Sequence, residues 1–271
     1  MADTQFRPAS ETVEPEHESA KTEPVQHENR VDPQGEGNVA LWVRVSKWAC
    51  FTILAWSILL QLIAGEIIPP VLAIGLVFGA IGPFLKGERR RLAGVTGLLG
   101  LVALGGNLPA TIDELSHPSS APAFILTLMV VVAALVLVVA GIAALRKADG
   151  DGVRPLVITS AAVFVAGVVV AIVAAAGVES ASALATDVKV TASGVEFEPT
   201  TLEVAAGESG FWVENLDGIR HTFSIHGTDY EIDVPGLSAQ RGTFDLAAGQ
   251  YEVFCAVPGH ENMKIDLTVE E

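Results

Sequence analysis

Sulfur is scarce in this 271-residue sequence, which contains two cysteines, Cys50 and Cys255, and three methionines. The two cysteines lie in segments of very different composition, so the sequence predicts no disulfide framework. Three methionines spread along the chain are also too few to form a ladder of thioethers across a membrane. The chemistry of the chain must therefore depend on a small number of sulfur atoms.

Histidine is absent from the long apolar segments, and charged residues are essentially absent from their centres. A haem held between two histidines inside a bilayer is thus excluded on ligand grounds. Ion and proton pathways normally contain charged groups at mid-span, which argues against a pump or transporter. The apolar segments are five runs, near residues 45–65, 67–85, 92–110, 122–145 and 155–178.

Each run approaches the roughly 20 residues that a helix needs to cross a bilayer. Basic residues precede the first run and follow the second and fourth, whereas acidic residues follow the first and third. The positive-inside rule then predicts five crossings, a cytoplasmic N-terminus and an extracytoplasmic C-terminus. The third run is weakened by Gly100, Gly105, Gly106 and Pro109. The first two runs are joined by Gly65-Glu66, as a tight helical hairpin or with one of the pair re-entrant.

The composition divides the chain into four parts. Residues 1–40 hold nine acidic and three basic residues and few apolar ones, which predicts a disordered cytoplasmic tail. Residues 41–178 form a helical membrane region, whose glycines and alanines favour close helix packing as an anchor or docking platform. Residues 179–186 are a short linker. Residues 187–271 are a separate domain with 16 acidic and four basic residues.

This last domain shows short alternating segments separated by turn signals, such as Phe211-Trp212-Val213 and then Leu216-Asp217-Gly218. Many short strands at regular spacing predict a β-sandwich. The predicted fold is therefore a transmembrane bundle of about five helices followed by an all-β Greek-key sandwich.

The second cysteine opens a loop that holds three potential metal ligands, Cys255, His260 and Met263, and His221 lies upstream in a predicted strand. A lone cysteine or histidine is usually a packing or surface residue. Together, one thiolate, two imidazoles and a thioether are the donor set of a mononuclear copper site that supports both Cu(I) and Cu(II).

Residues 187–270 resemble the cupredoxins, the plastocyanin- and azurin-like blue copper proteins. The resemblance is carried by Phe197-Glu198-Pro199, by His221-Thr222-Phe223, and by the segment from Gly249 through Cys255 to His260. It implies one type 1 copper ion with His221, Cys255 and His260 as equatorial ligands and Met263 as the axial ligand.

The spacing His260-x-x-Met263 departs from most loops of that family and resembles the dinuclear copper domain of cytochrome oxidase subunit II. That site needs two cysteines on one loop, and this loop has one, so we expect a mononuclear site. The short spacing leaves two candidates for the axial position, Met263 and Glu261.

Several neighbouring residues are expected to support the ligands. Thr222 resembles the family position that hydrogen-bonds toward the cysteine loop, and Asn215 is expected to brace a turn. His226 and His117 are not expected to bind metal. Four phenylalanines are expected to pack in the core or shield the site, namely Phe197, Phe211, Phe223 and Phe254. An apolar rim around His260, or ordinary loop packing, is expected from Leu216, Ile219, Val257 and Pro258.

The function predicted from these features is one-electron transfer by a non-enzymatic copper protein of the cytoplasmic membrane. The acidic surface would suit a basic redox partner such as a cytochrome c, or would serve general solubility. Membrane lipid is expected as a partner, and nucleic acid is not. The alternatives are a copper-handling or sensing protein and an accessory subunit of a respiratory oxidase.

Overall fold

The computed structural model describes residues 33–64 and 67–271. Most of the predicted tail, and the Gly65-Glu66 connection, lie outside the described residues. The first helix begins at Pro33, so residues 33–40 are helical where the sequence predicted disorder.

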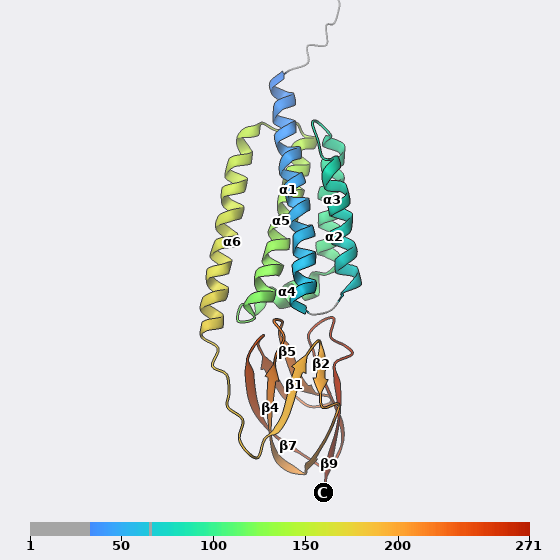
Figure 1. The fold of residues 1–271 in the computed structure, drawn as a ribbon, viewed down its shortest axis with the longest axis vertical. Coiled ribbons are helices and arrows are strands. Elements are labelled where there is room, and N and C mark those ends of the chain that lie inside the picture. The colour runs from blue at the N-terminus through green and yellow to red at the C-terminus, as the bar shows by residue number, and fades with distance from the viewer. Residues whose placement is uncertain (1–32, 65–66) are drawn as a thin grey trace, which may run out of the picture. The chain divides into compact units, whose positions relative to one another are not determined.

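Six α-helices occupy the first two thirds of the described chain, and each of the five apolar runs coincides with helix (Figure 1). Short 3-10 turns follow the second helix and precede the last. The helices are α1 (Pro33–Ala64), α2 (Pro69–Ile81), α3 (Arg90–Gly106), α4 (Leu108–Ser116), α5 (Ala121–Leu145) and α6 (Val153–Ala176).

Three of these helical segments are long and apolar enough to cross a membrane: Gly37–Ile63, Ala121–Leu145 and Gly150–Ala176. The helices α3 and α4 would make a fourth span if they act as one, but they are bent by 71° at Asn107. The bend falls between Gly106 and Pro109. It therefore lies in the third apolar run, which contains the helix-weakening glycines and proline. The prediction of about five crossings is therefore not confirmed, while the apolar helical region itself is.

Small residues let α3 and α5 approach closely. A side-chain carbon added to Gly141 would lie 2.7 Å from the Ala93 carbonyl oxygen, and one added to Gly97 would lie 3.0 Å from that of Leu137. Larger residues at these positions would push the backbones apart. The predicted role of small residues in helix packing is thus confirmed for this helix pair.

The C-terminal part is a β-sandwich, as predicted. One sheet has the strand order β2-β1-β4-β7 and the other has the order β3-β9-β8-β5-β6. The strands are β1 (Val188–Ser193), β2 (Glu196–Glu198), β3 (Thr201–Ala205), β4 (Gly207–Asn215), β5 (His221–Ile225), β6 (Glu231–Val234), β7 (Ala239–Leu246), β8 (Gly249–Phe254) and β9 (Lys264–Glu270).

Strand periodicity selects which side chains enter the core between the sheets. Along β5, the inward face carries His221, Phe223 and Ile225, because successive side chains of a strand point to opposite faces. Phe223 is fully buried and packs on Phe211 with 5.2 Å between ring centroids. The aromatic core therefore lies on the same face of β5 as a predicted metal ligand. Of the four phenylalanines, Phe254 alone is half-exposed.

Candidate metal centre

His221 is the first residue of β5, and its ring is fully buried at one end of the sandwich. Its Nδ1 atom lies 3.8 Å from the sulfur of Cys255, which follows directly after β8. The strands β5 and β8 are paired in the same sheet, so two distant parts of the sequence meet here.

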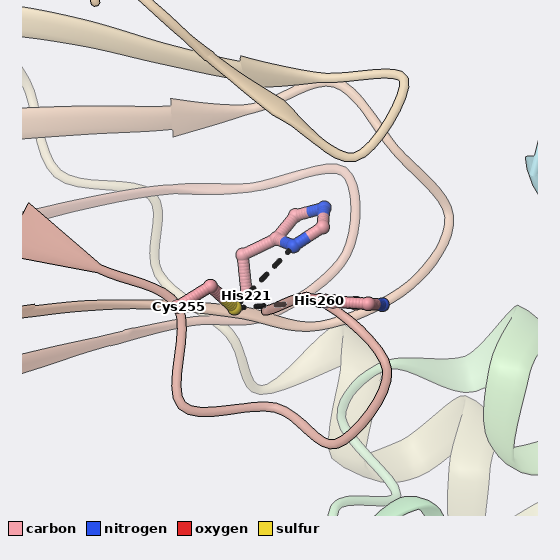
Figure 2. A group of neighbouring side chains, drawn as sticks. All are labelled: His221, Cys255 and His260. Carbon is pink, nitrogen blue, oxygen red and sulfur yellow. Dashed lines mark hydrogen bonds between the residues drawn. The ribbon is translucent and has the colours of Figure 1, made fainter. Parts of the chain in front are cut away.

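His260 completes a group of three ligand atoms. Its Nδ1 atom lies 3.5 Å from Cys255 Sγ, and the three donor atoms all lie within 4.8 Å of one another. Both rings direct a nitrogen toward the sulfur (Figure 2). The structure thus brings together the three residues that the sequence assigned as equatorial ligands.

The loop after Cys255 is folded on itself by backbone hydrogen bonds. His260 N donates to Val257 O at 3.1 Å, Met263 N donates to His260 O at 3.0 Å, and Cys255 N donates to Met263 O at 3.1 Å. Gly259 has a φ of +95°, a conformation that glycine adopts without steric cost. These bonds hold three of the candidate ligands in one tight turn.

The two candidates for the axial position differ sharply in their surroundings. Met263 is 1% exposed and belongs to the same buried cluster as Cys255. Glu261 is exposed, and its carboxylate accepts a hydrogen bond from Gly259 N at 3.0 Å. Met263 is therefore buried in the cluster that contains Cys255, whereas the Glu261 carboxylate is engaged with its own loop.

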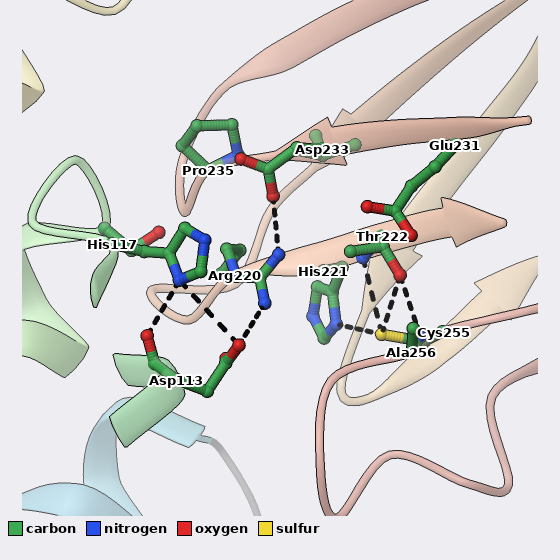
Figure 3. A network of polar contacts seen from close by, with 12 residues as sticks. Asp113, His117, Arg220, His221, Thr222, Glu231, Asp233, Pro235, Cys255 and Ala256 are labelled. Atoms are coloured by element: carbon green, nitrogen blue, oxygen red, sulfur yellow. Dashed lines mark hydrogen bonds and ion pairs between the residues drawn. The ribbon is translucent and has the colours of Figure 1, made fainter. Parts of the chain in front are cut away.

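Thr222 ties β5 to the cysteine loop, as the resemblance implied. Its backbone N–H donates to Cys255 Sγ at 3.4 Å, and its hydroxyl oxygen accepts a hydrogen bond from Ala256 N at 2.7 Å (Figure 3). Hydrogen bonds to the sulfur stabilise its anionic form. The expected supporting role of Thr222 is confirmed.

Asn215 braces the turn between β4 and β5, which confirms a second expectation. Its side-chain amide donates to Ile219 O at 2.8 Å and Val234 O at 3.0 Å, and its carbonyl oxygen accepts from Asp217 N at 2.9 Å. This turn positions His221 at the end of the sandwich.

The electrostatics of the group favour a thiolate. Burial acts to raise the pKa of the Cys255 thiol, but hydrogen bonds with His221 and His260 outweigh burial and lower the pKa from 9.0 to about 6. Burial likewise acts to lower the pKa of His221, but Asp217 and the Cys255 sulfur raise it. Since metals bind the thiolate, the site is poised to take up a metal near neutral pH.

Two charged residues beside the site were not singled out from the sequence. Asp217 contacts the His221 ring, with 2.9 Å between its Oδ2 atom and Nε2. Arg220 is 7% exposed and forms ion pairs with Asp233 at 2.8 Å and with Asp113 of α4 at 2.6 Å (Figure 3). The only sequence signal for Asp217 was its place in a predicted turn. The spacing of charged residues gave no indication that Arg220 pairs with a residue of a helix.

The two remaining histidines of the described chain, and the residues of the expected apolar rim, are not part of the ligand group. His226 is exposed, and His117, directly after α4, approaches Asp113 of that helix, with 2.7 Å between His117 Nδ1 and the Asp113 backbone oxygen. Of the four residues of the expected rim, Leu216 and Pro258 are exposed, whereas Ile219 and Val257 are buried. The apolar rim is therefore smaller than expected.

No curated protein sequence matches this chain. Among solved structures, a reduced Cu(I) form of an amicyanin mutant is 21% identical over 33% of this chain and 87% of its own length, with a TM-score of 0.27. A copper-containing nitrite reductase from Thermus scotoductus SA-01 is 24% identical over 35% of this chain and 24% of its own, with a TM-score of 0.25.

Residues 163–269 match the family described as a Cupredoxin-like domain. The matched segment contains every strand except the last residue of β9, together with the whole ligand group. One sulfur and two imidazole nitrogens within 4.8 Å, with a buried thioether in the same cluster, fit a copper ion better than a hard cation. The domain match and the donor set together support one type 1 copper ion as the cofactor of this chain.

Proposed function

We propose that this chain is a membrane-anchored mononuclear blue copper protein that transfers single electrons and transforms no substrate. The observation that carries the proposal is the convergence of His221 Nδ1, Cys255 Sγ and His260 Nδ1 at one end of the sandwich. Copper bound to these three residues would supply a one-electron couple, because sulfur favours Cu(I) while imidazole suits both oxidation states.

Met263 is proposed as the axial ligand. Its burial beside Cys255, and the exposed position of Glu261, support the thioether over the carboxylate. The proposed set is therefore His221, Cys255, His260 and Met263, with one ion.

The surrounding hydrogen bonds favour electron transfer because they hold the donor atoms in place independently of the oxidation state. Thr222 anchors the sulfur and the residue after it, and the loop bonds restrain His260 and Met263. Within the ligand group, His221 and Cys255 are buried and His260 is half-exposed. Electrons would therefore enter and leave through the His260 ring.

The membrane arrangement is proposed from charge and length. The basic residues between the helical runs support a cytoplasmic N-terminus, and the five crossings predicted from hydropathy would then put the sandwich outside the cytoplasmic membrane. The acidic sandwich would attract a basic redox protein, such as a cytochrome c, by electrostatic steering.

An optical and EPR spectrum of the full chain in detergent, loaded with copper, tests this function. We expect an intense visible band from thiolate-to-Cu(II) charge transfer, lost in Cys255→Ser and shifted in Met263→Leu. Cys50→Ser is the matched control, because Cys50 is the second free cysteine and is buried among the helices. A colourless copper-loaded wild type would refute the assignment.

Electron transfer and copper handling make opposite kinetic predictions. An electron carrier should exchange electrons rapidly with a basic cytochrome in stopped-flow experiments and should retain its copper against a Cu(I) chelator. Rapid copper loss together with slow electron exchange would favour handling or sensing. Stable association with haem proteins in detergent extracts would instead favour an oxidase subunit.

A further inference from the structure

Asp217 makes a contact with the buried histidine that the proposed function does not use. It lies in the turn between β4 and β5 and is 9% exposed. Its Oδ2 atom is 2.9 Å from His221 Nε2, while the other ring nitrogen of His221 is directed at Cys255. The carboxylate and the sulfur therefore engage opposite sides of one imidazole ring.

The Asp217 carboxylate is itself held by two backbone groups. Gly194 N donates to Oδ1 at 2.8 Å, and Val195 N donates to Oδ2 at 3.2 Å. Both residues have φ near +60°, in a turn that presents successive N–H groups to one anion. Positive φ is unusual for a β-branched residue such as Val195, and these bonds help to stabilise it. The carboxylate therefore cannot rotate away from His221 without losing two further hydrogen bonds.

These contacts determine which nitrogen of His221 carries the proton. An ionised carboxylate only accepts hydrogen bonds, so Nε2 must be the donor and Nδ1 keeps its lone pair for a metal. Among the described residues, the ion pairs of Asp217 involve His221 alone, whereas Arg220 is paired with Asp113 and Asp233. The negative charge of Asp217 therefore acts mainly on the imidazole.

We propose that Asp217 is a positioning residue of the copper site, which fixes the Nε2–H tautomer of His221 and lowers the reduction potential by favouring Cu(II). A carboxylate behind a ligating imidazole makes the ring a stronger electron donor. The higher positive charge of Cu(II) gains more from this donation than Cu(I) does. The inference rests on the proposed function, since it requires copper at His221.

Asp217→Asn in the full chain should raise the reduction potential by at least about 59 mV, which corresponds to a tenfold change in a one-electron equilibrium. Asp217→Glu should recover part of the shift. Asp233→Asn is the matched control, because it removes a carboxylate near Arg220 without a bond to the ring. An unchanged potential in a folded, blue Asp217→Asn, or an equal shift in Asp233→Asn, would overturn the proposal while leaving the copper assignment intact.

The tautomer can be tested without a variant. The chain has six histidines, so selective 15N-histidine labelling resolves each ring by NMR in detergent. We expect His221 of the copper-free chain to carry a proton on Nε2, in slow exchange with water, although no metal then dictates the tautomer. A proton on Nδ1 alone, or rapid exchange at Nε2, would contradict the role of Asp217 even if Asp217→Asn failed to fold.

A second inference concerns the helical region. A groove of about 420 Å³ lies there between α1 and the segment after α2. Its floor includes Val43 and Leu85, which are at most 2% exposed. Its walls carry three cations, Arg44, Lys47 and Lys86. None of the three has a carboxylate partner within 4.0 Å among the described residues.

We infer that this groove binds the headgroup of an anionic phospholipid. Arg44 and Lys47 lie within the apolar helix Gly37–Ile63, where a lipid headgroup and its first methylenes would meet cations and an apolar floor together. Trp48, which is 64% exposed, borders the same groove, and tryptophan favours the membrane interface.

Native mass spectrometry of the full chain with phosphatidylglycerol and with phosphatidylcholine tests this site. We expect selective retention of phosphatidylglycerol, reduced at least tenfold in Lys47→Gln/Lys86→Gln and unchanged in Arg91→Gln. The control residue is an exposed cation of α3 outside the groove. Equal retention by the double variant, no selectivity between the lipids, or equally tight binding of inorganic phosphate would overturn the assignment.

Discussion

The helical region and the sandwich differ most in what they expose. Exposed large apolar side chains are frequent along α1, α3, α5 and α6, whereas after Ala176 they are limited to Leu184, Leu216 and Leu237. A surface of the first kind is stable in hydrocarbon, and one of the second kind is stable in water. The same chain therefore contains two parts that bury side chains for different physical reasons.

Their buried polar groups also differ. In the helical region these are hydroxyls such as Ser46 and Thr96, which bond the carbonyl oxygens of their own helix. In the sandwich several of them surround His221 and connect different strands, whereas Asp187 is paired with Arg241 of β7. The buried hydroxyls of the helices thus bond within their own helix, whereas the polar residues around His221 join separate strands beside the ligand group.

The largest expected effect is a loss of stability when the aromatic core of the sandwich is truncated. Phe223→Ala should destabilise the sandwich by about 4 kcal/mol, because the ring is fully buried between other aromatic side chains. Limited proteolysis across a urea series would measure the loss, with Phe254→Ala as the half-exposed control. Equal loss in both variants would contradict the assignment of Phe223 to the core.

The next effect concerns helix packing. Gly141→Ala should destabilise the helical region by about 2 kcal/mol, since the new carbon would lie 2.7 Å from the Ala93 carbonyl oxygen. Gly105→Ala makes the same chemical change where no atom lies within 4 Å and should be neutral or stabilising. Thermal unfolding in detergent distinguishes them, and the visible copper band should be unaffected in both variants.

A smaller effect is expected at the contact between α4 and the sandwich. Arg220→Met should cost about 1 to 2 kcal/mol, because Asp113 and Asp233 lose their shared cation. Lys264→Met breaks an exposed pair with Glu252 and should cost less. Parallel denaturation of the two variants would show whether the buried ion pairs contribute more stability than the exposed one. A larger cost for Lys264→Met would contradict this expectation.

The smallest effect is a dependence on pH. Hydrogen bonds from Arg241 lower the pKa of Asp187, so this carboxylate contributes stability above its ordinary value of 3.8 and loses it as pH falls through the folded value. Asp187→Asn should therefore lose less stability than the wild type on acidification below pH 3.8. Urea midpoints for both proteins across this range provide the measurement, and parallel curves would rule out the linkage.

The ligand group could be predicted from the sequence because its information is local. Cys255, His260 and Met263 lie on one loop, and strand alternation places His221 inward on a neighbouring strand. Thr222 followed from its position beside His221. Metal-binding residue types at such short spacing allow few interpretations other than a metal site.

Contacts between distant segments could not be predicted in the same way. Asp217 accepts hydrogen bonds from the backbone of Gly194 and Val195, more than twenty positions away in the sequence. Periodic patterns predict secondary structure, and they do not indicate such a contact. The Arg220–Asp113 pair depends on how two parts of the chain meet. Hydropathy also identified every apolar run but not the bend at Asn107, because hydropathy reports composition rather than direction.

The anchoring of Thr222 has a consequence for the geometry of the ligand group. Because one residue bonds both the sulfur and the first residue of the loop, a change at Thr222 would displace two neighbouring parts of the ligand group together. The geometry of the sulfur is therefore linked to that of a strand on which it does not lie.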